Sequence, residues 1–350
     1  MSLSFGNPAE SLEGVELANG WKVKKIVKKK PHETGGHFSV CYTVEKDSKE
    51  AFLKAFDFAE AFGSDDLISK LNSLTTAFIF ERDLLYKCKN KHLGKIVTPL
   101  DHGQYNIIGQ PSYLSVYYII FDIAKSNLRN QISNMQKFDL AWIMRSLHHT
   151  AVGINQLHQN GIAHQDLKPS NVLIFDKESK IGDLGRSSDL NVPGPNDKFI
   201  VPGDSTYAPF ELFYKIEFGN NFQLRYASDL YHLGSLIFFY FLRLNLQQII
   251  LCEMEKNDLI KNITRRDFQS DLPYFQEGFT YALKMLENEI SKYSLTLKNE
   301  LIPLVKMLCE PDPSLRGHPA DIKSKHSQYS LIRFISKFDQ IAKKAEYGLL

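Results

Sequence analysis

One stretch decides the fold of this chain of 350 residues: His164-Gln165-Asp166-Leu167-Lys168-Pro169-Ser170-Asn171-Val172-Leu173-Ile174, followed by Ile181-Gly182-Asp183-Leu184-Gly185. It sets a carboxylate, an ammonium group and an amide at offsets 0, +2 and +5, and a second carboxylate further on. Asp166 can accept a hydroxyl proton, and Lys168 can neutralise a migrating phosphate. Asn171 and Asp183 can ligate Mg²⁺. The stretch therefore predicts chemistry on a phosphoryl group.

These residues resemble the catalytic loop and the metal-binding turn of eukaryotic-type Ser/Thr protein kinases, with His-Gln-Asp for His-Arg-Asp and Asp-Leu-Gly for Asp-Phe-Gly. A lone aspartate before Lys-Pro would be an ordinary solvated loop, but so many matching positions between His164 and Gly185 make chance assembly improbable. The resemblance implies that ATP and Mg²⁺ are the cofactors, that Asp166 and Lys168 are catalytic, and that Asn171 and Asp183 hold the metal.

Further upstream, Thr34-Gly35-Gly36-His37-Phe38-Ser39 lies where the family has its glycine-rich loop. Thr34 and Ser39 replace two of the family's glycines, and a tight turn alone would also explain the Gly-Gly pair. The nucleotide-binding residues that the resemblance implies in this loop are Gly35, Gly36, Phe38 and Ser39.

Lys54 ends Ala51-Phe52-Leu53-Lys54, which resembles the Val-Ala-Ile-Lys motif whose lysine holds the α- and β-phosphates. An unpaired lysine on an apolar strand is costly to bury. The family pairs it with a glutamate on a helix, and Glu81 is the expected partner, with Glu60 as a rival. The long spacing from Lys54 to Glu81 predicts an insertion around Asp57–Leu74.

Tyr117–Ala124 resembles the last strand of the N-terminal lobe and the hinge that follows it. The resemblance implies that backbone groups of Asp122 and Ala124 bind the adenine edge, and that Phe121 closes the back of the nucleotide site.

Three features are expected further along the chain. Gly203–Glu211 resembles the segment that ends in Ala-Pro-Glu, with Phe210 before the glutamate. Glu211 is expected to form a buried ion pair with Arg316, and Asp229 to anchor the backbone of the catalytic loop.

Two departures from the family pattern concern regulation and specificity. Gln165 replaces the arginine that grips a phosphorylated activation loop, so activity is expected not to need that phosphorylation strictly. Asp204 stands where Ser/Thr kinases often have a threonine, and it adds negative charge near Asp166. Lys168 still favours Ser/Thr over Tyr acceptors. Leu184, in place of phenylalanine, should keep the apolar packing.

The hydrophobic pattern, with strands first and helices after them, predicts an α+β chain of two lobes. The resemblance implies a bilobal protein-kinase-like fold, with a small antiparallel-sheet N-lobe carrying one main helix and a larger, mainly helical C-lobe. The expected domains are a loosely ordered leader (1–20), the N-lobe (21–122) and the C-lobe with a C-terminal helix (123–350). The expected strands are 21–27, 38–44, 51–56, 96–102 and 114–121, and the expected helices are 75–88, 140–158, 229–242, 279–292, 301–308 and 331–344.

Composition narrows the class of protein. A formal net charge of +2 gives no general attraction to nucleic acid or to an acidic membrane. The four cysteines have no metal-ligand spacing and are expected to be reduced core thiols. The most apolar stretch, Leu233–Cys252, contains polar residues and is expected to be a buried helix that runs into a turn. With no evident signal peptide, we expect a cytoplasmic protein with no nucleic-acid or membrane partner.

The sequence therefore predicts a protein kinase that transfers the γ-phosphate of Mg-ATP to Ser/Thr hydroxyls of protein substrates. Two alternatives stay open at this point: a pseudokinase scaffold that binds nucleotide without transfer, and a kinase-fold enzyme acting on a small molecule. The protein substrate, the activating signal, the oligomeric state and the role of residues 247–298 do not follow from the sequence.

Overall fold

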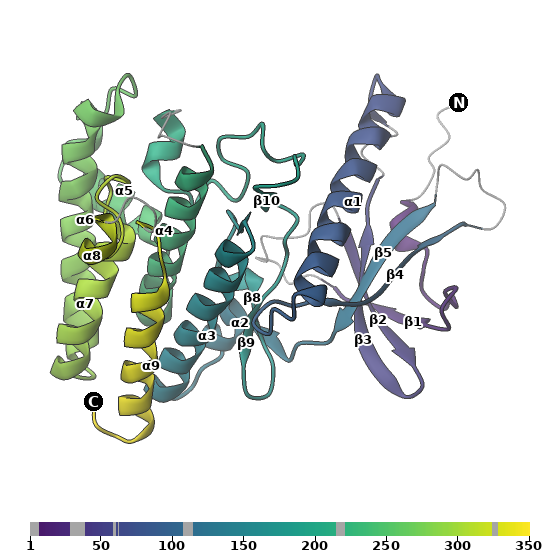
Figure 1. The fold of residues 1–350 in the computed structure, drawn as a ribbon, viewed down its shortest axis with the longest axis horizontal. Coiled ribbons are helices and arrows are strands. Elements are labelled where there is room, and N and C mark those ends of the chain that lie inside the picture. The colour runs from purple at the N-terminus through teal and green to yellow at the C-terminus, as the bar shows by residue number, and fades with distance from the viewer. Residues whose placement is uncertain are drawn as a thin grey trace. The chain divides into compact units, whose positions relative to one another are not determined.

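The computed structural model describes residues 7–28, 39–58, 61, 63–107, 115–214, 221–323 and 328–350. The chain divides into two compact units. Unit 1 comprises residues 1–125 with 182–185, and unit 2 comprises residues 126–181 with 186–350. Unit 1 is built on an antiparallel sheet and unit 2 is mostly helical (Figure 1), which confirms the expected α+β class. The observed division falls three residues after the predicted boundary at 122, and the turn 182–185 belongs to unit 1.

Unit 1 contains a five-stranded antiparallel sheet in the order β1-β2-β3-β5-β4. The strands are β1 (Lys22–Ile26), β2 (Ser39–Lys46), β3 (Lys49–Phe56), β4 (Pro99–Tyr105) and β5 (Val116–Asp122). They lie within a few residues of the expected positions, although the predicted strand starts at Phe38 and Leu114 fall outside the described residues.

The long helix α1 (Leu67–Asn90) lies beside this sheet (Figure 1). It begins earlier than the expected start at residue 75, because the carboxylate of Asp66 caps it by accepting a hydrogen bond from Ser69 N at 3.0 Å. Part of the insertion predicted at Asp57–Leu74 therefore lengthens the helix.

One face of the sheet is covered by the N-terminal segment. Alternate residues of the strands, such as Tyr42 and Leu53, form a core with Ala9, Leu12 and Leu17, and all of these side chains are buried. The expectation of a loosely ordered leader is therefore wrong for residues 7–20. The physical reason is that strand alternation leaves one apolar face of the sheet in need of cover.

Unit 2 is a set of packed helices with three short strand pairings. The helices are α2 (Leu128–Ser133), α3 (Leu140–Gln159), α4 (Asn221–Leu242), α5 (Leu246–Lys256), α6 (Phe268–Ser291), α7 (Leu295–Cys309), α8 (Pro319–Ile322) and α9 (Ile332–Glu346). The strands pair as β6 (Ser126–Asn127) with β8 (Val172–Ile174), β8 with β9 (Ser179–Ile181), and β7 (Ile162–Ala163) with β10 (Ser188–Asp189).

The apolar stretch 233–252 is divided between two helices. The chain turns after α4 at Arg243, which has a positive φ of 60°, and Asn245 then caps α5 by accepting a hydrogen bond from Gln248 N at 2.7 Å. The sequence predicted the first helix and the turn but not α5. Within the described parts of the chain, no single helix is long and apolar enough to cross a membrane; α4 and α5 meet that test only as a pair, and they are bent by 75°.

The C-terminal helix α9, close to the expected range 331–344, packs against α3 (Figure 1). Arg145 of α3 fixes this contact, because its guanidinium donates hydrogen bonds to Asp339 Oδ1 at 2.8 Å and to Glu346 Oε1 at 2.7 Å.

Candidate functional site

Lys54 of β3 is held by two carboxylates of unit 1. Its Nζ donates hydrogen bonds to Glu81 Oε1 of α1 at 2.7 Å and to Asp183 Oδ1 at 3.2 Å. Burial alone would lower the pKa of Lys54, but the charges of Asp183 and Glu81 outweigh it and raise that pKa above its usual value. The expected pairing of Lys54 with Glu81 is therefore confirmed; the rival Glu60 lies outside the described residues. Lys54 is therefore a cation held in a fixed position by two carboxylates.

The other residues predicted to bind nucleotide belong to β2 and to the end of β5. Gly35, Gly36 and Phe38 lie outside the described residues. Ser39 is the first residue of β2 and is buried. Asp122 ends β5, its exposed carboxylate lies 2.7 Å from Lys49 Nζ, and Ala124 follows two residues later.

The three expected residues of the catalytic loop lie close together in unit 2. Lys168 Nζ is 3.1 Å from Asp166 Oδ2. Asn171 Nδ2 donates hydrogen bonds to the backbone carbonyl of Asp166 at 2.8 Å and to its Oδ2 at 3.2 Å. All three residues are buried. The carboxylate of Asp166 is thus held in one orientation beside an ammonium group, as a group that positions an acceptor hydroxyl must be.

Asp229 of α4 anchors the backbone of this loop, as predicted. Its carboxylate accepts hydrogen bonds from His164 N at 2.8 Å, from Gln165 N at 2.7 Å and from His158 Nε2 at 2.8 Å. Burial alone would raise the pKa of Asp229, but the hydrogen bond and charge of His158 lower it. The ionised carboxylate can therefore hold Gln165 at a φ of 64°, a conformation that few residues other than glycine adopt.

Asp204 joins the catalytic loop from the segment that follows it. Asp204 N donates a hydrogen bond to Asp166 Oδ1 at 2.8 Å, and Lys168 Nζ donates one to Asp204 Oδ2 at 3.4 Å. Burial alone would raise the pKa of Asp204, but hydrogen bonds from Thr206 and the charge of Lys168 lower it. Asp204 therefore accepts the hydrogen bond from Lys168 that a threonine would accept. Lys168 lies between the carboxylates of Asp166 and Asp204, and its positive charge offsets the negative charge that Asp204 adds.

Gln165 is bound by neutral groups and by an arginine from another element. Its Nε2 donates hydrogen bonds to Ser188 Oγ at 2.9 Å and to the carbonyl of Arg186 at 3.1 Å. Arg225 of α4 donates to Gln165 Oε1 at 2.5 Å and to the carbonyl of Asp197 at 3.0 Å. Arg225 thus supplies a guanidinium to this segment in place of the arginine missing at position 165. Nothing local in the sequence could have identified it.

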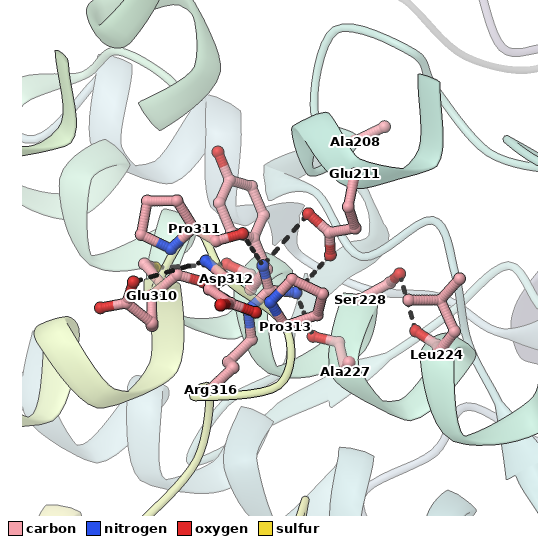
Figure 2. Close-up of polar contacts among 12 residues, drawn as sticks. Ala208, Glu211, Leu224, Ala227, Ser228, Glu310, Pro311, Asp312, Pro313 and Arg316 are labelled. Atoms are coloured by element: carbon pink, nitrogen blue, oxygen red, sulfur yellow. Dashed lines mark hydrogen bonds and ion pairs between the residues drawn. The ribbon is translucent and has the colours of Figure 1, made fainter. Parts of the chain in front are cut away.

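Glu211 and Arg316 form a fully buried ion pair, as expected. Arg316 Nη1 is 2.6 Å from Glu211 Oε1, and Nη2 is 3.2 Å from Oε2. Figure 2 shows the guanidinium between Glu211 and the carbonyl of Ala227, to which Nη1 donates at 3.1 Å. Arg316 Nε also donates a hydrogen bond to the carbonyl of Glu310 at 2.9 Å. The charge of Arg316 is therefore matched by one carboxylate, and its remaining donors are satisfied by the backbone.

Oxygen atoms of the types that bind Mg²⁺ occur at the expected positions in each unit separately. No group of three or more His, Cys, Asp or Glu side chains able to hold a metal occurs among the residues that the structure describes. Mg²⁺ in phosphoryl-transfer sites takes one or two carboxylates together with the oxygens of the substrate phosphates. Asp183 supplies a carboxylate within unit 1, and Asn171 carries an amide oxygen within unit 2.

Comparisons with known proteins identify the family. The model of the protein kinase domain matches residues 36–327. The chain is 26% identical over 259 residues to a protein of Acanthamoeba polyphaga mimivirus named as serine/threonine-protein kinase R436, covering 70% of this chain and 82% of that one. It is 27% identical over 166 residues to the interferon-induced, double-stranded RNA-activated protein kinase of Mus musculus, covering 47% and 29% of the two chains.

A third relative, named as serine/threonine-protein kinase gdt8 of Dictyostelium discoideum, is 26% identical over 239 residues, which make up 63% of this chain and 17% of that one. The chain thus spans less than a third of the length of the mouse and Dictyostelium relatives. The match over most of the chain confirms the predicted protein-kinase-like fold, since the sheet of unit 1 and the helices of unit 2 are those expected of it. The chain belongs to the protein kinase family.

Proposed function

We propose that this chain transfers the γ-phosphate of Mg-ATP to Ser or Thr hydroxyls of protein substrates. The observation that carries the proposal is the pair of fixed charge arrangements: Lys54 held by Glu81 and Asp183, and Asp166 held beside Lys168. Members of the family use these positions on one nucleotide. A cytoplasmic location is part of the proposal, supported by four cysteines that are all free thiols.

Each residue has a proposed role, which comes from its contacts or from the family to which the chain belongs. Lys54 orients the α- and β-phosphates, and Asp122 and Ala124 offer backbone groups to the adenine edge. Asp166 accepts the proton of the acceptor hydroxyl while Lys168 lowers the charge of the migrating phosphate. Mg²⁺, held by Asp183 and Asn171, would neutralise charge on the phosphates. Gly35, Gly36, Phe38 and Ser39 would cover the phosphates with backbone N–H groups.

Incubation with labelled ATP, Mg²⁺ and a general protein acceptor tests the proposal. We expect label on Ser and Thr of the acceptor after acid hydrolysis and phosphoamino-acid separation. Asp183→Ala should lose both the transfer and the Mg²⁺-dependent part of nucleotide binding. Label on a small-molecule acceptor such as an aminoglycoside, with none on protein, would contradict the proposed substrate class.

We further propose that activity does not require phosphorylation of the activation segment. The Gln165 amide is already bonded to Ser188, to the carbonyl of Arg186 and to Arg225. Arg225 also donates to the carbonyl of Asp197 and lies 3.8 Å from its carboxylate. The guanidinium that reaches Gln165 is therefore already engaged by groups of the protein itself. Ser187 and Ser188 are also completely buried, so a kinase could not reach them in this conformation.

A protein with alanine at Ser187, Ser188, Ser205 and Thr206 tests this second proposal. Transfer within about tenfold of the parent is the expected result, since Asp204 still bonds Lys168 without Thr206. Phosphatase treatment of the parent should likewise leave transfer unchanged. Complete loss of transfer in both experiments would show that a phosphate is needed.

A further inference from the structure

Phe52 lies on the same face of the sheet as Lys54. The two residues are two positions apart on β3, and side chains two apart on a strand point to the same face. The intervening Leu53 points the other way, into the core beneath the N-terminal segment. Phe52 stands where the Val-Ala-Ile-Lys motif has its alanine, so a large ring replaces one methyl group beside the fixed lysine.

The strand register fixes what surrounds this ring. Lys54 is paired with Cys41 of β2 and with Ile119 of β5, and the next row on the same face is Thr43, Phe52 and Phe121. Ala51 then pairs with Asp122 at the end of β5. The row that contains Phe52 therefore lies between Lys54 and Asp122.

A nucleotide that binds at both Lys54 and Asp122 must lie across the row that contains Phe52. In the proposed function, on which this inference rests, Lys54 binds the phosphates, and backbone groups of Asp122 and Ala124 bind the adenine edge. Phe121, the cross-strand partner of Phe52 on this face, is itself buried. Directly opposed Cβ atoms lie only about 5 Å apart, so the two side chains share a narrow space.

The ring of Phe52 differs in its contacts from the ring of Phe56, which lies further along β3 on the same face. Phe56 packs edge-on against Phe78 of α1, with ring centroids 4.8 Å apart, and so belongs to the core between sheet and helix. Phe52 makes no ring–ring contact with another aromatic side chain among the described residues and is only partly buried. It is therefore positioned to meet a ligand on this face.

We propose that the Phe52 ring takes part of the space that an adenine base needs. As a consequence the chain binds Mg-ATP chiefly through its triphosphate and gains little from the base. The expected signature is weak discrimination between ATP and GTP and a high KM for ATP.

Phe52→Ala tests this directly, with Phe52→Val as a second variant that introduces a β-branched residue suited to a strand. Binding of Mg-ATP and of Mg-tripolyphosphate, which has no base, is measured by calorimetry on the full chain, and KM and kcat for ATP come from the transfer assay. Phe52→Tyr keeps the ring. Phe213→Ala removes a half-exposed ring from unit 2 and serves as the control.

We expect Phe52→Ala and Phe52→Val to bind Mg-ATP at least tenfold more tightly, to lower KM with little change in kcat, and to bind tripolyphosphate as the parent does. Phe52→Tyr and Phe213→Ala should behave like the parent. Unchanged or weaker ATP binding in folded Phe52→Ala and Phe52→Val, or an equal gain for tripolyphosphate, overturns the inference. Tighter ATP binding without transfer in any of these proteins would uphold it while sinking the proposed activity.

Discussion

In each unit a largely buried lysine is matched by two carboxylates. Lys54 lies between Glu81 and Asp183, and Lys168 lies 3.1 Å from Asp166 and 3.4 Å from Asp204. A buried charge that loses its partner is far more costly than one at the surface, so such pairs fix the positions of side chains strongly. The pair of Glu211 and Arg316 shows the same principle without any proposed role in chemistry.

Glu211→Gln should destabilise the protein by about 3–5 kcal/mol, because it leaves the guanidinium of Arg316 buried without a countercharge. Replacing both residues by leucine should cost less than Glu211→Gln alone. Urea unfolding followed by circular dichroism measures both. The control is Lys261→Ala, which removes an exposed pair with Asp258 and should change the free energy of unfolding by less than about 1 kcal/mol. An effect of Glu211→Gln as small as that of the control would contradict this account.

At the scale of elements, the segment 186–204 is held to helix α4 and to the catalytic loop by a few polar contacts. Arg225 of α4 donates hydrogen bonds to Gln165 and to the carbonyl of Asp197, and Gln165 of the loop donates one to the carbonyl of Arg186. Further along, Asp204 N donates a hydrogen bond to Asp166, so the position of this segment and the orientation of the Asp166 carboxylate depend on each other.

Arg225→Ala should therefore loosen segment 186–204 and lower kcat by about tenfold, with a much smaller change in nucleotide affinity. Hydrogen exchange followed by mass spectrometry should show faster exchange in 186–204 and unchanged exchange in the sheet of unit 1. Arg225→Lys keeps the positive charge but lacks the planar guanidinium that donates to two partners at once. It should therefore retain more of the rate than Arg225→Ala does, but less than the parent. Equal exchange in the parent and in Arg225→Ala would refute the role given to this arginine.

At the scale of the whole molecule, one buried histidine links stability to pH. Burial lowers the pKa of His232 on α4 to about 4, below its ordinary value of about 6.5. The unfolded chain therefore takes up a proton at a higher pH than the folded chain does. The stability that the neutral imidazole contributes is fully present above about pH 6.5 and is lost as the pH falls toward about 4.

Between pH 7.5 and pH 5 this single group should reduce the free energy of unfolding by about 2 kcal/mol. His232→Gln should show a correspondingly smaller fall over the same range, even if it is less stable at every pH. Replacement of the exposed His92 by Asn should leave the pH dependence as in the parent. An identical pH profile in His232→Gln and the parent would rule out this linkage.

The parts of the molecule that could be predicted from the sequence depend on neighbours in the chain. The catalytic loop is recognisable because Asp166, Lys168 and Asn171 keep a fixed local spacing, and Lys54 because it ends an apolar strand. The N-terminal segment, Arg225 and His158 could not be predicted, because each acts on residues far away in the sequence. Helix α5 was missed because the break at Arg243 resembles the end of a helical region.

The most direct test of the central claim compares the parent with Asp166→Ala in transfer and in nucleotide binding. Asp166 is bonded to Asn171, Lys168 and the backbone of Asp204, all within unit 2, whereas the proposed phosphate-binding Lys54 belongs to unit 1. The account predicts that labelled phosphate transfer to protein falls at least about a thousandfold in Asp166→Ala while Mg-ATP affinity stays within about threefold. Equal transfer by the two proteins would contradict it.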